Sequence, residues 1–218
     1  MRADALALVT ALLLAPAAAH AAPSFKPVDE GPRDPSFAVF RDSLRAALAR
    51  HDAEAVLAVV DSNIKNGFTG DDGIAAFERQ WHPRSMDSPL WRELGATLAL
   101  GGTFDRDGNF VAPYVYSHWP EVYDAFEYVA ITGTRVRVRE GPSTDDPVMG
   151  HASYEILRLD TDGPNGNVLR VQGWTTVDFG SEYSGYVDSR YVRSPVGYRA
   201  FFTRGAAGWR MVLFLAGD

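Results

Sequence analysis

The residues of this chain that are able to carry out chemistry are few and widely spaced. The 218 residues contain no cysteine, so no thiolate nucleophile is present. The G-x-S-x-G motif of serine hydrolases is also missing. The histidines lack the spacing of a metal site; they are His20, His51, His82, His118 and His151. The sequence therefore predicts no catalytic residue, no metal and no cofactor.

Two of these histidines support an alternative, in which the chain is a small enzyme or a small-molecule-binding protein. His82 and His118 each stand next to a tryptophan, and in this alternative both face one pocket. Asp124 or Glu127 would then act as the base. Single histidines beside aromatic residues are more often packed or exposed without a task, so the non-catalytic interpretation is preferred.

Asp105, Asp107 and Asn109 alternate in the way that calcium ligands do. However, Gly108 is in the fourth place of this stretch, whereas a calcium loop has its glycine in the sixth, and no glutamate closes twelve residues. An ordinary hairpin turn between two short strands is the preferred interpretation.

Composition and the first residues predict an exported protein. The net charge of −7 argues against nucleic acid or an anionic membrane as partner, because both bind basic patches. Residues 1–21 have the basic start, short apolar run and A-x-A end of a signal peptide, with cleavage after Ala21. No cysteine is available for a lipid anchor, and no second apolar run is long enough to span a bilayer. We expect a periplasmic or secreted protein without a membrane anchor.

Helices dominate the first half of the chain. Residues 22–35 are rich in proline, glycine and charge and are predicted to be a flexible lead-in. Apolar residues at helical spacing then predict four helices, at 37–48, 53–60, 71–81 and 88–98.

Polar residues mark the starts of these helices. Ser88 is the predicted N-cap of the last helix, and Asp71 or Asp72 that of the third. Arg41 in the first helix is expected to face away from the core.

From Thr134 the apolar period becomes that of strands. Val136 and Val138 share one face, and Arg135, Arg137 and Arg139 share the other. Short strands separated by closely spaced turns follow, which is typical of a small barrel.

The order of motifs in this region resembles the bacterial SH3-like domain. The matching stretches are "VRVREGPS" from residue 136, "VMG" from 148, "WTTV" from 174, "GYV" from 185 and "YV" from 191. The chain departs from the pattern at Glu140, where a small residue is usual, and in its long polar loop from Asp160 to Gln172. The resemblance implies a small all-β barrel at about 131–193 that binds peptidoglycan, or a peptide or protein of the cell envelope.

The last residues, 196–218, have the pattern of a β-hairpin with a buried second strand. A lone hairpin is not stable, so it needs a partner sheet. We therefore predict an α+β chain in which an SH3-like domain (131–195) is inserted in a helical α+β domain (36–130 with 196–218). Its helices would cover a curved antiparallel sheet, an order that resembles the cone of the nuclear transport factor 2-like superfamily.

Exposed aromatic side chains are the predicted ligand-binding residues of the SH3-like groove: Trp174, Tyr183, Tyr186 and Tyr191. Core packing is an equal alternative for them. Tyr183 is favoured most, because it lies among small and polar residues. The predicted function is non-catalytic binding in the bacterial cell envelope.

Overall fold

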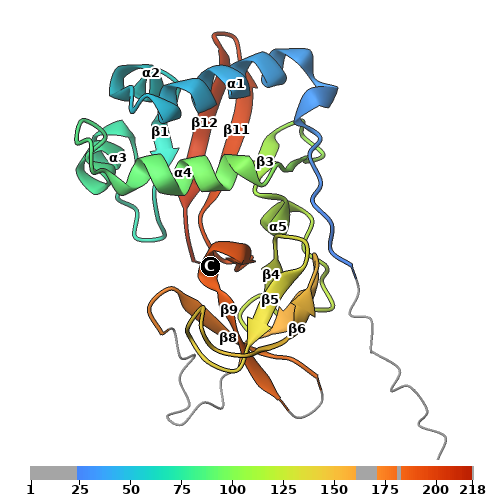
Figure 1. The fold of residues 1–218 in the computed structure, drawn as a ribbon. Helices are drawn as coiled ribbons and strands as arrows, with labels where there is room; N and C mark the ends of the chain where they lie inside the picture. Colours follow the sequence, from blue (N-terminus) through green and yellow to red (C-terminus); the bar gives the residue numbers. More distant parts are fainter. Residues whose placement is uncertain (1–23, 161–170, 181–182, 218) are drawn as a thin grey trace, which may run out of the picture.

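Figure 1 shows the chain as a mixed α+β structure with three β-sheets. This computed structural model describes residues 24–160, 171–180 and 183–217. The predicted signal peptide and most of the predicted loop at 160–172 lie outside these ranges. Within them, no helix is both long enough and apolar enough to cross a membrane.

Four helices pack against a five-stranded sheet, which we call the large sheet. The helices are α1 (Pro35–Ala49), α2 (Ala53–Leu57), α3 (Ile74–Trp81) and α4 (Pro89–Ala99). In spatial order, the strands are β1 (Val60–Lys65), β12 (Gly208–Leu215), β11 (Arg199–Gly205), β3 (Phe110–Ala112) and β2 (Thr103–Phe104).

The sequence predicts an antiparallel sheet, but the large sheet is mixed. The other pairings are antiparallel, but β1 runs parallel to β12. The reason is that β1 joins the edge of the terminal hairpin instead of pairing with a strand close to it in the sequence.

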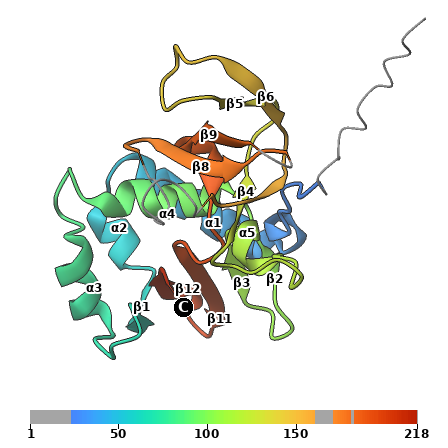
Figure 2. The ribbon, with the colours of Figure 1, turned by 90° about the horizontal axis from the view of Figure 1, so that it is seen from below.

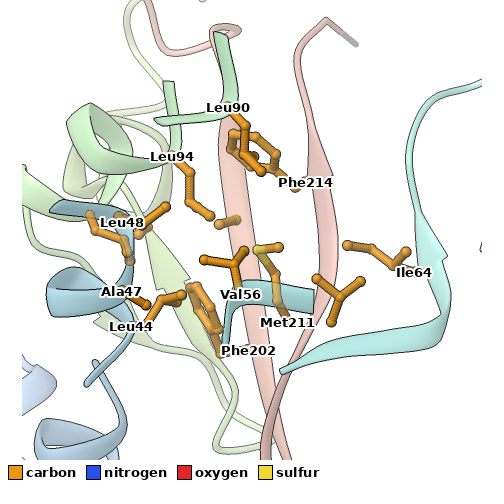
Figure 3. Close-up of a cluster of buried hydrophobic side chains, with 14 of the residues drawn as sticks. Leu44, Ala47, Leu48, Val56, Ile64, Leu90, Leu94, Phe202, Met211 and Phe214 are labelled. Carbon is orange, nitrogen blue, oxygen red and sulfur yellow. The ribbon is translucent and has the colours of Figure 1, made fainter. Parts of the chain in front are cut away.

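The apolar faces of the helices and of the large sheet share one core. In Figure 3, Leu44 of α1 and Leu94 of α4 lie over Phe202 and Met211 of the terminal hairpin, and Ile64 of β1 lies at the side. Each of these side chains is at most 3% exposed. The apolar faces predicted for α1, α3 and α4 are buried. The second predicted helix, 53–60, is too long, because α2 ends at Leu57 and Val60 begins β1.

The sequence predicts the N-cap of α4 correctly but not that of α3. Ser88 caps α4 as expected, because its Oγ accepts a hydrogen bond from a first-turn amide at 3.1 Å. The predicted cap of α3 by Asp71 or Asp72 is wrong. Its N-cap is Gly73 with φ 89°, a conformation that favours glycine. The Asp72 carboxylate instead accepts from the Asn66 amide at 3.0 Å.

The described residues between 128 and 193 form two smaller sheets. We call these residues the small β unit. One sheet contains β10 (Val192–Arg193), β4 (Tyr128–Ile131) and β7 (Ile156–Arg158). The other contains β6 (Val148–Ala152), β5 (Val136–Arg139), β9 (Ser184–Asp188) and β8 (Trp174–Asp178).

Both small sheets contribute to one core, which includes Ile131, Val138 and Val187. A bridge between Leu159 and Val177 links their edges. The described strands do not close into a continuous barrel, so the SH3-like barrel stays a prediction.

The small β unit lies, in the sequence, between two strands that are neighbours in the large sheet. Ala112 of β3 pairs with Ala200 of β11. The short helices α5 (Tyr114–Ser117) and η2 (Ser189–Tyr191) also lie in this connection. Arg193 of β10 donates to Thr97 Oγ1 of α4 at 3.1 Å, which ties the small β unit to the helices. That the two parts are separate domains stays a prediction.

The segment before α1 is not the flexible lead-in that its composition predicts. Phe25 is 6% exposed, and its ring lies 5.1 Å from that of Tyr114. The Phe25 amide donates to the Tyr154 carbonyl at 2.5 Å, and later backbone hydrogen bonds reach Gly102. Figure 1 shows this segment running from α1 along α5 to the small β unit. We call residues 24–31 the N-terminal strap.

Arg41 of α1, expected to face solvent, is 5% exposed. Its guanidinium donates to Asp29 Oδ1 at 2.5 Å and lies 5.9 Å from the ring centres of Phe37 and Phe110. A buried charge requires such a partner. The acid is in the strap, before the short helix η1 (Gly31–Arg33), so the pattern within α1 does not indicate the burial.

Candidate functional site

A groove of about 380 Å³ lies on the small β unit. Residues from β5, β6, β8, the end of β9 and η2 line it. Figure 2, seen from below, shows these strands on the near side of the molecule. The groove combines basic side chains with the aromatic rings of Trp174 and Tyr191.

Strand β5 supplies most of the basic side chains. Arg137 and Arg139 alternate with the two buried valines of the strand, and Arg135 precedes it. Successive side chains of a strand point to opposite faces, so the arginines lie away from the core. Arg139 is only 8% exposed, and its guanidinium donates to the Asp146 carbonyl at 2.6 Å. Arg139 thus holds the turn after β5, while Arg135 and Arg137 are exposed.

The backbone at Arg135 is unusual. Its φ is 50°, in the left-handed region that few non-glycine residues adopt. The Arg135 amide donates to Ser153 Oγ at 2.8 Å, which holds the turn in place. Conformations of this kind gather at binding and catalytic sites.

Trp174 and an arginine–aspartate pair form another wall. Trp174 starts β8 and lies opposite Asp188 of β9, so their side chains share a face. The Arg190 guanidinium donates to both Asp188 oxygens, at 3.0 Å from Nε to Oδ1 and 2.6 Å from Nη2 to Oδ2. These hydrogen bonds from Arg190 lower the pKa of the Asp188 carboxyl. The acid is therefore ionised at neutral pH.

Tyr191 closes the groove beside the turn that carries Arg135. Its carbonyl accepts from the Thr132 amide at 2.9 Å. A methyl group on Gly133 would come within 3.2 Å of the Tyr191 ring, so this glycine lets the ring lie against the backbone. Tyr191 is 43% exposed and therefore offers much of its ring to a ligand.

The net charge of the groove is positive, although that of the chain is −7. The one lining acid, Asp188, is paired with Arg190. Among the residues that the structure describes, the guanidinium groups of Arg135 and Arg137 have no hydrogen-bond or ion-pair partner. These two groups are free to bind an anion.

The four aromatic residues predicted as ligand contacts are not all in the groove. Trp174 and Tyr191 line it, whereas Tyr183 and Tyr186 do not. Tyr186 is partly buried and lies opposite Thr176 of β8. Tyr183 is 65% exposed, which agrees with the expectation that its ring is difficult to bury.

The two histidines of the alternative interpretation are exposed, on different elements. His82 ends α3 with φ 46°. His118 ends α5, and its ring stacks on Phe25 of the strap at 6.3 Å. Neither lines the groove or the cavity described next, and the shared pocket stays a prediction.

A second cavity, of about 610 Å³, lies between α1 and α4. His51 follows α1, and its ring is stacked on Trp91 at 5.0 Å and 5°. Its Nδ1 is buried and has no hydrogen-bond partner in the described part of the chain. The stacked rings of His51 and Trp91 thus line this cavity.

The structure shows no metal centre in the ranges it describes. No three His, Asp or Glu side chains gather there as ligands could. The Asp105 carboxylate accepts from the amides of Asp107 and Asn109, both at 2.9 Å. These residues therefore form the hairpin turn between β2 and β3.

Two of the four aromatic residues that the sequence predicts as ligand contacts, Trp174 and Tyr191, line the groove, whereas its positive charge is not predicted. The alternation of Arg135 and Arg137 indicates only the outer face of a strand. His151 lies directly opposite Arg137 across β5 and β6. Arg190 comes from η2. Strand register and the path of the chain bring these residues together, and local patterns do not show either.

Comparisons with known proteins add no further restriction on what the groove binds. The chain matches no protein-family model, no curated protein and no solved structure.

Proposed function

We propose that this chain is an exported, non-catalytic binding protein of the bacterial cell envelope. Its small β unit would be an SH3-like barrel that binds peptidoglycan or an envelope peptide. One observation carries the proposal: a preformed groove on that unit combines two aromatic rings with two unpaired guanidinium groups. The common core of the two small sheets and the bridge between their edges support the barrel.

The groove has the features of a site for an extended polar ligand. Trp174 and Tyr191 present apolar ring surface with a polar tip, which suits sugars and peptide backbone. At about 380 Å³ the groove is near the lower end of ordinary ligand sites, large enough for a few residues of a peptide. The signal-peptide pattern predicted for residues 1–21 supports the envelope as the location.

The test is co-sedimentation of the mature chain, residues 22–218, with purified peptidoglycan sacculi. We expect the wild type to be retained and Tyr191→Ala to lose most of its retention. Tyr183→Ala is the matched control, because Tyr183 is exposed on the same unit but outside the groove. Circular dichroism would show that both variants are folded. Equal retention of both variants would remove the groove from the proposal, and no retention of the wild type would refute wall binding.

A second candidate function is small-molecule binding between α1 and α4. The stacked His51 and Trp91 rings, with a buried unpaired Nδ1, favour this cavity over the exposed His82 and His118. Native mass spectrometry of the protein purified from its own host is the measurement. A bound compound that is absent from His51→Ala would support this candidate, and a ligand-free spectrum of the wild type would count against it.

A further inference from the structure

We propose that the groove of the small β unit recognises free carboxylates, and that Arg135 and Arg137 form the clamp that binds them. The occupant we infer is a peptide segment with carboxylates that are not amidated. The identity of this peptide as part of the cell wall rests on the proposed function. The carboxylate clamp itself stands on the geometry of the groove.

Only some of the cations that line the groove are free to bind a ligand. Four arginines line the groove, but two of them are already engaged. Arg139 is buried and donates to a backbone carbonyl at 2.6 Å, and Arg190 is bound to Asp188 on both carboxylate oxygens. Arg135 and Arg137 are exposed, and neither guanidinium has a partner in the described ranges. The clamp is therefore composed of these two side chains.

The second step is their spacing. Arg137 lies in β5 and Arg135 lies just before it, and both line the groove. Because they are two residues apart, their Cα atoms are separated by at most roughly 7 Å. Guanidinium groups bind carboxylates through two parallel hydrogen bonds. Two such groups at this spacing suit either one carboxylate held from both sides or two carboxylates on neighbouring peptide residues. His151, opposite Arg137, adds a polar ring beside the same position.

The third step is what distinguishes a peptide from other anions. Trp174 stands opposite Asp188, which remains ionised and paired with Arg190. Arg190 is therefore not available to a ligand, and two free cations are too few for a ligand that is negatively charged along its whole length, such as a polyphosphate. A peptide with one or two carboxylates and an otherwise neutral backbone fits both the two free cations and the aromatic wall. Stem peptides of peptidoglycan have this chemistry.

The experiment compares native sacculi with sacculi whose carboxylates have been converted to amides by carbodiimide and ammonia. We expect wild-type retention to be about tenfold lower on the amidated sacculi, because two charge-assisted contacts at a partly exposed site are lost. Arg135→Gln/Arg137→Gln should be about tenfold weaker on native sacculi and insensitive to amidation. Arg79→Gln/Arg106→Gln removes the same charge elsewhere and should behave as wild type.

A soluble probe separates the clamp from wall binding. It is an N-acetylated tripeptide with a central glutamate, compared by calorimetry with its fully amidated form. Binding of the acid but not the amide, with no retention on sacculi, would support the clamp and refute the wall as its target. Equal wild-type retention on native and amidated sacculi would overturn the clamp and leave wall binding standing. Tighter binding of a polyphosphate chain than of sacculi would overturn the peptide as occupant, and failure of every probe would overturn both proposals.

Discussion

Replacing Phe25 by alanine tests whether the N-terminal strap holds the two parts of the molecule together. The ring is 6% exposed and packs against Tyr114 at 5.1 Å and against the edge of Trp119 at 5.5 Å. A buried phenylalanine removes roughly 150–200 Å² from water, worth about 4 kcal/mol at 25 cal/mol/Å². Alanine keeps one carbon of the side chain and the backbone hydrogen bonds. We therefore expect a loss of about 3 kcal/mol, at the low end for such substitutions.

The measurement is the thermal midpoint Tm of residues 22–218. For a chain of this size each kcal/mol lowers Tm by about 2–4 °C, so Phe25→Ala should lower it by about 6–12 °C. Phe126→Ala is the matched control, because that ring is 62% exposed and should change stability by less than about 0.5 kcal/mol. A glutamate-specific protease should also cleave after Glu30 faster in Phe25→Ala, because the strap detaches more often. A Tm within about 2 °C of the wild type, with unchanged cleavage, would refute the strap's role.

Three further substitutions test other contacts. Asp188→Asn releases the Arg190 guanidinium and should increase retention on native sacculi by about two- to fivefold; a decrease would contradict the charge argument. Because hydrogen bonds from Arg190 lower the pKa of Asp188, this pair stabilises the fold above about pH 4 and the effect is lost at lower pH. The free energy of unfolding of Asp188→Asn, measured in urea, should not show this loss at low pH. Burial raises the pKa of Tyr114 to about 12, so the neutral phenol is favoured and stability falls as pH rises from about 10 to 12. Over this pH range the free energy of unfolding of Tyr114→Phe, measured in urea, should fall by roughly 2 kcal/mol less than that of the wild type. Identical pH profiles of the two proteins would refute this effect of Tyr114. Ser88→Ala removes the cap of α4 and should cost about 1–2 kcal/mol in urea unfolding, whereas no change would show that the cap is dispensable.

Local patterns predicted the elements whose causes are local. Helix α4 starts at Ser88 and Pro89 and ends before Gly101, as the capping signals indicated. Alternation and glycine turns predicted β5, β8, β9 and the terminal hairpin close to where they lie, but they did not predict β4. In these cases the residues that decide the structure are within a few positions of one another.

Features that depend on distant partners were not predicted. The strap is held by one ring and by backbone hydrogen bonds, neither of which leaves a periodic pattern. Arg41 is buried because Asp29 binds it. The pairing of β1 with β12 brings Val60, between two of the helices, to Met211 near the end of the chain. For the same reason the sequence showed Trp174 and Tyr191 as candidates but not the arginines that share their groove.

The position of the terminal hairpin in the large sheet has a consequence for the order in which the chain folds. Strands β11 and β12 lie between β1 and β3, yet they follow every other element in the sequence. During synthesis the helices α1 to α4 therefore emerge before two of the strands that they cover. Bringing Ala200 back to Ala112 also closes a long loop, which slows folding unless the small β unit has already compacted it. We expect such late completion of the core to keep the chain unfolded for longer after synthesis.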